Sequence, residues 1–338
     1  MKENTGGSSP AGWAPFRIEP HFVSRVWGHR DLRPWFDHVA TGEPVGEVWL
    51  TGDQCSAATG QHAGETLGRL FEAAPRALLG DGAPTHDSPL LVKVIFAREK
   101  LSVQVHPDDA LARKYGQPRG KTECWYALAA DPGAQVAVGL KPGTSIEAVR
   151  EKIGSNTLER SLKIVQIHKG DMVFVDAGTV HAIWPGSVLL EVQQNSDITY
   201  RLYDYGRPRE LHVEKGLEAA RIETRAGKVP PEVLEDRTVL IDVEYFRMER
   251  IAIAGAMPSD RLNGPLPAGA RPGLSYLFAA GGKGRISGPG FEPVELPPRS
   301  IACVPAEAPL FTVEDLGGLD LIRIVAMWPA GTNKELSP

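Results

Sequence analysis

Cysteine is scarce in this sequence, and long apolar runs are missing. The cysteines are Cys55, Cys124 and Cys303, too few and too scattered for a disulfide framework or a C-x-x-C metal motif. We therefore expect a reducing compartment. No apolar run approaches the roughly 20 residues that span a bilayer, and the polar start of the chain lacks the apolar segment of a signal peptide. These absences predict a cytoplasmic protein with no membrane partner.

An excess of positive charge is missing as well. The formal net charge is -5, whereas a general nucleic-acid binder needs a basic surface to neutralise phosphates. We therefore expect no nucleic-acid partner. A small phosphorylated substrate is not excluded, because it needs only a local cluster of lysine and arginine.

Glycine and proline, in contrast, are abundant, with 36 and 28 residues spread along the chain. They separate short β-type runs, a pattern that suits a sandwich or a barrel. The runs are Gly46–Leu50, Leu90–Phe96, Gln135–Gly139, Met172–Val175, Ser187–Gln193, Thr199–Tyr203, Tyr245–Ile253, Leu274–Phe278, Ser300–Val304 and Leu319–Ala326.

Helical patterns are fewer. They cover His62–Leu79, which Pro75 breaks or kinks, and the shorter segments Pro107–Tyr115, Ser145–Lys152 and Glu210–Ala220. Ser145 is a candidate N-cap. The sequence therefore predicts a mainly β fold with a small helical accessory region.

The length of 338 residues suggests two domains. The composition changes near 225–235, which we interpret as a linker. We predict a flexible tail over residues 1–15, a first domain with helical elements over 16–230, and a second β domain over 236–330. A weak repeat aligns Val175 with Val304 and sets Leu310 opposite His181. A second barrel of the same shape and two unrelated strand-turn-strand units explain this repeat equally well.

The strongest local signal combines four polar residues. Gln104 and His106 are two positions apart on a β-type stretch, so their side chains share a face, as do those of Lys121 and Glu123. His181 ends a strand-turn-strand unit. Gln104, His106, Glu123 and His181 together offer two imidazoles, a carboxylate and an amide oxygen, which suits Zn²⁺ or another first-row divalent ion.

Single histidines are more often hydrogen-bonded structural residues, and a chain with nine histidines brings such residues together by chance. Spacing alone leaves both interpretations open. Farther along, Glu191 lies on a strand and Arg201 on the next one. An arginine can fork onto phosphate or polarise a sugar oxygen, although Arg201 as a surface ion-pair residue is the simpler interpretation.

These segments resemble the type I phosphomannose (mannose-6-phosphate) isomerases in their short bacterial form. The resemblance rests on LSVQVHPDD, GKTECWYAL, GDMVFVDAGTVHAI and LLEVQQNSDITYRLYDYGR, together with RVWGH at Arg25–His29. It covers roughly 25–220. It implies cupin (jelly-roll-like) β-barrels, two in tandem: residues 16–230 would form the catalytic cupin domain, and 236–330 a second, metal-free cupin-like domain.

The resemblance also implies roles for individual residues. The metal site of the family falls on Gln104, His106, Glu123 and His181, and its catalytic arginine on Arg201. Ser102 and Lys121 match polar residues near substrate, and Trp27, Glu191 and Asp197 match positions that line the pocket. Gly120 stands where longer members carry a histidine, which puts the identity of the proton-transfer base in doubt.

The implied activity interconverts mannose 6-phosphate and fructose 6-phosphate through an enediol, with one divalent metal per chain, Zn²⁺ by preference. The metal would act as a Lewis acid, Arg201 would add fixed positive charge, and Lys121 or Glu191 would be the base. We favour Lys121. Lys93, Lys100 and Arg201 are the cations considered for the phosphate.

Two other functions fit parts of this pattern. A non-haem iron oxygenase also uses two histidines and a carboxylate. Gln104 as a fourth ligand argues against it, as do Lys121 and Arg201, which suit an anionic substrate. A non-catalytic sugar-binding cupin would not need all four metal-binding side chains. The expected partner is a small phosphorylated sugar, and the expected state is a monomer or a homodimer.

Overall fold

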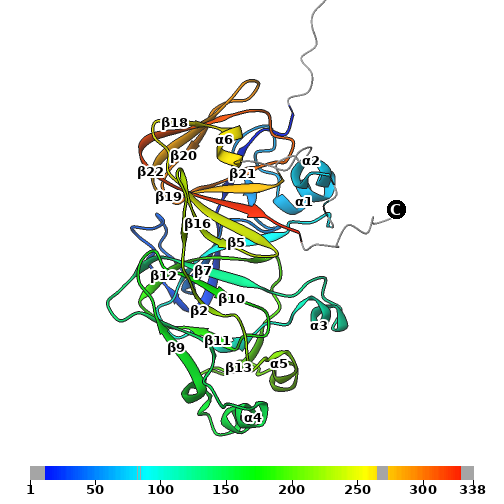
Figure 1. Cartoon of the computed structure of the whole chain (residues 1–338), viewed down its shortest axis with the longest axis vertical. Helices are drawn as coiled ribbons and strands as arrows, with labels where there is room; N and C mark the ends of the chain where they lie inside the picture. The colour runs from blue at the N-terminus through cyan, green and yellow to red at the C-terminus, as the bar shows by residue number, and fades with distance from the viewer. Residues whose placement is uncertain (1–11, 82, 84, 265–272, 329–338) are drawn as a thin grey trace, which may run out of the picture.

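The computed structural model describes residues 12–81, 83, 85–264 and 273–328. Within them, the strands form three antiparallel sheets. Figure 1 shows the C-terminal strands in the upper half of the molecule and α4 (Ile146–Gly154) and α5 (Val213–Ala219) at the lower end. No helix in this described part is long and apolar enough to cross a membrane.

The seven-stranded sheet has the order β14-β10-β7-β12-β5-β3-β2. Its strands are β2 (His21–His29), β3 (Val45–Trp49), β5 (Leu90–Phe96), β7 (Glu123–Ala130), β10 (Met172–Val175), β12 (Ser187–Gln194) and β14 (Gly227–Val229). The five-stranded sheet has the order β13-β6-β11-β8-β9. Its strands are β6 (Val103–Val105), β8 (Gln135–Leu140), β9 (Leu162–Gln166), β11 (His181–Ile183) and β13 (Tyr200–Tyr203).

The ten-stranded sheet contains the C-terminal strands and two strands from the start of the chain. Its strands are β1 (Phe16–Glu19), β4 (Ser56–Ala57), β15 (Glu232–Val233), β16 (Arg237–Asp242), β17 (Phe246–Ile251), β18 (Ala256–Pro258), β19 (Ser275–Ser287), β20 (Val294–Leu296), β21 (Ile301–Val304) and β22 (Thr312–Ala326). The mainly β, cupin-type architecture expected from the sequence is confirmed.

The remaining helices are short: α1 (Leu67–Ala73), α2 (Pro75–Leu79), α3 (Asp109–Lys114), α6 (Ser259–Asn263) and the 3-10 helix η1 (Leu158–Ser161). The helix predicted from His62 starts later, because the Thr66 side chain caps α1 by accepting from the Arg69 N–H, and Pro75 begins a separate helix. Ser145 caps α4 as predicted.

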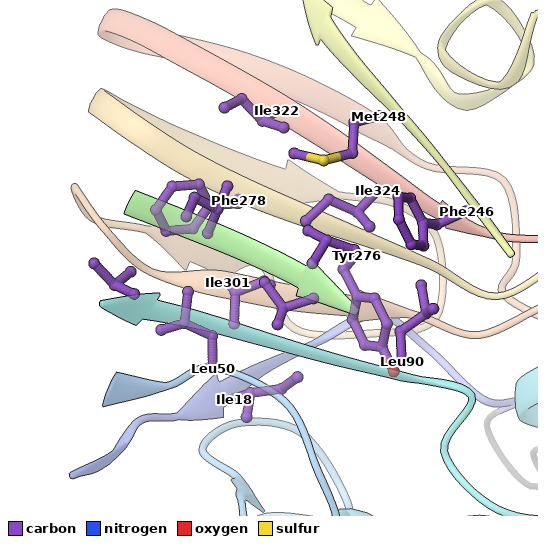
Figure 2. Packing of buried hydrophobic residues seen from close by; sticks show 14 of the residues in the cluster. Ile18, Leu50, Leu90, Phe246, Met248, Tyr276, Phe278, Ile301, Ile322 and Ile324 are labelled. Carbon is purple, nitrogen blue, oxygen red and sulfur yellow. The ribbon is translucent and has the colours of Figure 1, made fainter. Parts of the chain in front are cut away.

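Alternation along the strands sorts the side chains between two layers. On β7, Trp125 and Ala127 join a core between the seven- and five-stranded sheets, whereas Cys124, Tyr126 and Leu128 face the C-terminal sheet. On β7, the alternation therefore separates the side chains that face the interior of the first barrel from those that face the C-terminal sheet. Figure 2 shows part of the second layer, in which Ile18, Leu50 and Leu90 pack against Tyr276, Phe278 and Ile324.

The predicted division near residues 230–236 describes the chain incompletely. β1 pairs with β21 and with β4, so N-terminal strands complete the C-terminal sheet. Packing also begins before residue 16: Pro15 is buried, and Trp13 stacks on His62 with ring centroids 4.1 Å apart. The rest of the predicted tail, residues 1–11, lies outside the described residues.

The weak repeat does not give Leu310 a place equivalent to that of His181. Leu310 is 74% exposed, whereas His181 is 1% exposed. The buried charge in the C-terminal sheet is instead an Arg237–Glu249–Arg323 group, with Arg323 Nη1 3.0 Å from Glu249 Oε2.

Candidate metal centre and substrate cavity

The four predicted metal ligands come from both sheets of the first barrel. His181 and Gln104 are direct partners where β11 pairs with β6, and His106 lies just beyond the end of β6. Glu123 begins β7 in the opposite sheet, on the same face as Trp125. Because all four positions face the barrel interior, residues far apart in sequence meet between the sheets.

The donor atoms of this cluster are close together. A ring nitrogen of His106, a ring nitrogen of His181 and a carboxylate oxygen of Glu123 lie within 4.8 Å of one another. Glu123 Oε2 is 3.6 Å from His106 Nε2, and Glu123 Oε1 is 3.4 Å from His181 Nε2. The Gln104 amide nitrogen is 3.2 Å from His181 Nε2, and a half-turn of the amide would present its oxygen instead.

Both imidazoles are oriented for a cation. His106 Nδ1 donates to the Ile198 carbonyl at 2.7 Å, and His181 Nδ1 donates to the Thr179 carbonyl at 2.8 Å. This tautomer leaves each Nε2 lone pair directed at the cluster. Glu123 Oε1 is buried and has no hydrogen-bond partner among the described residues. An orphaned carboxylate oxygen 3.4 Å from one such lone pair, with the second imidazole close by, is the environment that a divalent cation would complete.

The electrostatics agree with that fit. Burial and the positive charge of Lys121 lower the pKa of His106 well below its ordinary value, and burial lowers the pKa of His181 to about 4. Both rings are therefore neutral near pH 7, as metal ligands must be. Burial and the nearby charge of Glu191 raise the pKa of Glu123 to about 7, a cost that a cation at this point would offset.

Beside the cluster, buried charges alternate in sign. Lys121 contacts Glu123, and its Nζ is 3.6 Å from Glu191 Oε1. Lys93 Nζ lies 2.9 Å from the same Glu191 oxygen and 3.6 Å from Glu47 Oε2. Such a chain satisfies charges that would be costly to bury singly.

A cavity of about 370 Å³ opens over the cluster. Most residues predicted for catalysis or substrate binding line it: Trp27, Lys93, Ser102, Lys121, Glu191, Asp197 and Arg201, together with Gln104. Lys100 does not belong to this lining. Its ammonium group pairs with Glu159 and lies 4.3 Å from the centre of the Trp184 ring, so the geometry gives no support for Lys100 as a phosphate contact.

Lys93 and Lys121 are both paired with buried carboxylates. Lys93 is neutralised by Glu47 and Glu191. Lys121 pairs with Glu123 and Glu191.

The sequence interpretation missed Arg25, Glu47, Thr199 and Arg209, which also line the cavity. Arg25 could have been found, because it is two positions from Trp27 on one strand. Arg209 could not, because it follows a turn. Burial and the charge of Arg209 lower the pKa of Arg201, and Arg201 Nε is buried without a hydrogen-bond partner in the described part of the chain. This side of the cavity is therefore suited to an anion.

Gly120 occupies a position that accepts no side chain. A Cβ there would lie 2.5 Å from the Pro107 carbonyl oxygen and 2.5 Å from the Asp108 carbonyl carbon. Ordinary van der Waals contacts of a Cβ are 3.4–4 Å long, so this backbone arrangement requires glycine. A histidine at this point would need a different path for the neighbouring loop.

Known proteins resemble the chain over most of its length. The model of the type I phosphomannose isomerase catalytic domain matches residues 16–138. A probable mannose-6-phosphate isomerase of Bacillus subtilis is 34% identical over 320 residues, which cover 89% of this chain and 96% of that protein. A mannose-6-phosphate isomerase of Streptococcus mutans is 34% identical, covering 72% and 80%. The crystal structure of a mannose 6-phosphate isomerase from Bacillus subtilis matches with a TM-score of 0.80 and 30% identity, covering 92% of this chain and 99% of that one.

Proposed function

The chain belongs to the type I phosphomannose isomerase family, and we propose that it interconverts mannose 6-phosphate and fructose 6-phosphate at a metal centre held by Gln104, His106, Glu123 and His181. The observation that carries this proposal is the pair of neutral imidazoles facing an orphaned, buried carboxylate oxygen beneath a cavity with several cations. Zn²⁺ is the preferred ion, because two imidazoles and a carboxylate form a donor set of catalytic zinc sites.

When bound, the metal supplies Lewis-acid polarisation of a substrate oxygen. The chain supplies the remaining parts of the chemistry. Moving a proton between C1 and C2 through an enediol requires a group that reaches the centre, and Lys121 Nζ lies 3.2 Å from His106 Nε2. Glu191 is a weaker candidate, because its Oε2 already accepts from Trp125 Nε1 at 2.8 Å and its Oε1 forms an ion pair with Lys93 Nζ at 2.9 Å. Lys121 is therefore the proposed proton carrier.

Arg201 is the proposed source of fixed positive charge for the substrate. Lys93 is already paired with two carboxylates and Lys100 points elsewhere. Among the described residues, the Arg201 side chain makes one hydrogen bond, from Nη1 to the Glu210 carbonyl, and keeps other donors available. It can bind the phosphate or stabilise negative charge that develops on the enediol oxygens. Arg209 lines the same cavity, but its guanidinium is paired with Asp204. Ser102, Trp27 and Asp197 complete the substrate walls.

The test is turnover of mannose 6-phosphate in a coupled assay, before and after removal of metal by a chelator. We expect activity to disappear with the metal and to return with added Zn²⁺. Full activity in protein shown to be free of metal would reject the proposed centre, and absence of turnover in zinc-loaded protein would reject the substrate.

Variants of the ligands sharpen this test. Glu123→Ala and His181→Ala should each abolish bound metal and turnover together. His168→Ala is the matched control, because His168 is exposed and pairs with Asp171 away from the cavity, and it should retain both. Metal at full occupancy in either ligand variant would remove that residue from the set.

A further inference from the structure

Three consecutive backbone amides lead into the site, and each is hydrogen-bonded. The Gly120 N–H donates to Asp109 Oδ1 at 2.8 Å, the Lys121 N–H to the Pro107 carbonyl at 3.1 Å, and the Thr122 N–H to Gln194 Oε1 at 2.9 Å. Because Lys121 and Glu123 follow one another on this stretch, these bonds fix where both side chains enter the cavity.

Asp109 connects these contacts to the C-terminal sheet. Its Oδ1 also accepts from Gln194 Nε2 at 3.0 Å, and its Oδ2 accepts from the Tyr245 hydroxyl at 3.2 Å. Tyr245 lies in the turn between β16 and β17, and its carbonyl accepts from the Met327 N–H at 2.9 Å beyond β22. We refer to Asp109, Gln194 and Tyr245 as the Asp109 bridge.

The close approach of Gly120 to the backbone of 107–109 limits how far the residues of the Asp109 bridge can move. With no room for a Cβ between Gly120 and the backbone of 107–109, the two loops are in direct contact. His106 lies at one end of that contact, and Lys121 at the other. A shift of Asp109 would therefore move a metal-binding side chain and the proposed proton carrier relative to each other.

The bridge is not part of a dry core. Asp109, Gln194 and Tyr245 line a second cavity, of about 700 Å³, whose lining includes none of the four predicted metal ligands. Asp109 and Tyr245 are only half-buried. Hydrogen bonds made in competition with water contribute little to stability, so geometry is the property that they can control.

We propose that Asp109 is a positioning residue for Lys121 and the metal centre. The Tyr245 hydroxyl holds the Asp109 carboxylate in place, so that the C-terminal sheet takes part in catalysis through the Asp109 bridge. This inference rests on the proposed function for its kinetic consequences. Its structural consequence, the protection of the amides at 120–122 from hydrogen exchange, depends only on the hydrogen bonds described above.

The experiment compares Asp109→Ala, Asp109→Asn and Tyr245→Phe in the zinc-loaded, full-length chain. Asp109→Ala should lower kcat by about 10- to 100-fold, as expected when a side chain that orients a metal site is removed, with a smaller change in KM. Asp109→Asn should recover most of the activity, because an amide oxygen still accepts from Gly120 and Gln194. Tyr245→Phe should lower kcat by about three- to tenfold.

Tyr115→Phe is the matched control. It also removes a hydroxyl that donates to a carboxylate, that of Glu218 on α5, and it lies directly after α3. It should leave kcat unchanged. Hydrogen exchange of the segment around 120–122 gives a readout that is independent of substrate, and it should accelerate in Asp109→Ala while the rest of the barrel keeps its protection.

Normal kcat in both Asp109→Ala and Tyr245→Phe, or unchanged exchange at 120–122, would overturn the inference. If the wild-type chain fails to isomerise mannose 6-phosphate, the proposed function fails separately. Zinc affinity then decides the positioning role: a loss in Asp109→Ala that Asp109→Asn restores supports it, and equal affinity in all variants rejects it.

Discussion

At the scale of single residues, Arg201 is the cation whose removal should separate metal binding from chemistry. It is not one of the three clustered residues, and its Nε is buried without a hydrogen-bond partner in the described structure. Arg201→Ala should therefore keep full metal content but lose about 100- to 1000-fold in kcat, the usual loss when a donor to developing charge is removed.

The measurement pairs the coupled assay with metal analysis of the same sample. Arg150→Ala is the control, because Arg150 is an exposed arginine that pairs with Glu214 on the helical side of the molecule. It should behave as wild type. Turnover near the wild-type level in Arg201→Ala would reject its catalytic role.

Gly120 offers a second residue-scale prediction. In Gly120→Ala the new methyl group meets backbone atoms at 2.5 Å, which cannot move as a side chain can. The variant should lose about 1–3 kcal/mol of unfolding free energy and bind metal more weakly. Gly154→Ala is the control, because its Cβ would meet nothing within 4 Å. Wild-type melting and metal affinity in Gly120→Ala would contradict the close approach.

Residue spacing predicted part of the site for a physical reason. Side chains two apart on a strand share a face, so Gln104 with His106 and Lys121 with Glu123 were visible as pairs. Which other strands join them was not visible, because pairing across sheets is a tertiary property. Glu47 and Arg209 reach the cavity in this way, and nothing local to either position distinguishes them from surface charges.

At the scale of elements, apolar runs in the sequence predicted the buried strands well, but they missed the glycine-rich parts of the longest strands. β5 was predicted with its observed bounds. β19 was predicted only for Leu274–Phe278, yet it continues to Ser287 through AAGGKGRIS. Register shifts at Ala279–Gly284 against β22 accompany these glycines. Bulged, glycine-rich strands lack the alternation that marks a strand in sequence.

The neighbouring strands β3, β5 and β12 carry the alternating charges, which makes their packing sensitive to acid. Burial alone would raise the pKa of Glu47, but the charges of Lys93 and Arg25 outweigh it and lower the pKa to about 2. The ordinary value is 4.5. The folded state is therefore stabilised by this carboxylate above pH 4.5, and the stabilisation is lost as the pH falls toward 2.

The Glu47→Gln variant tests whether the ionised carboxylate stabilises the packing of β3, β5 and β12. In metal-free protein, the wild type should exceed the variant in unfolding free energy by roughly 3 kcal/mol at pH 7, and the gap should narrow between pH 4.5 and the lowest accessible pH. Denaturant titrations at each pH measure it. Glu19→Gln, at an exposed position of β1, should follow the wild type throughout. A gap that does not change with pH would show that Glu47 is not held ionised.

At the scale of the whole molecule, the two parts of the chain share one core. Residues of β5, β7 and β12 pack in the same cluster as residues of β17, β19 and β22, and β1 crosses from the first part into the C-terminal sheet. Composition predicted a linker near 225–235, a region that holds β14 and β15. It could not show the crossing of β1, because that depends on which sheet an N-terminal strand joins. The C-terminal sheet is thus part of the same folding unit as the metal centre.

That shared core predicts that metal binding stabilises the entire chain. At a free Zn²⁺ concentration of about 1,000 times Kd, binding adds about 4 kcal/mol to the unfolding free energy. Calorimetry should show a single unfolding transition whose midpoint temperature rises with Zn²⁺, and hydrogen exchange in β19 and β22 should slow together with exchange in β7.

Phe278→Ala empties a buried position of the shared core outside the cavity lining. It should lower the unfolding free energy by about 3–5 kcal/mol with or without metal, while kcat at low temperature is retained. Two transitions, with the metal shifting only one of them and β19 exchange unaffected, would mean that the sheets unfold independently despite their contact.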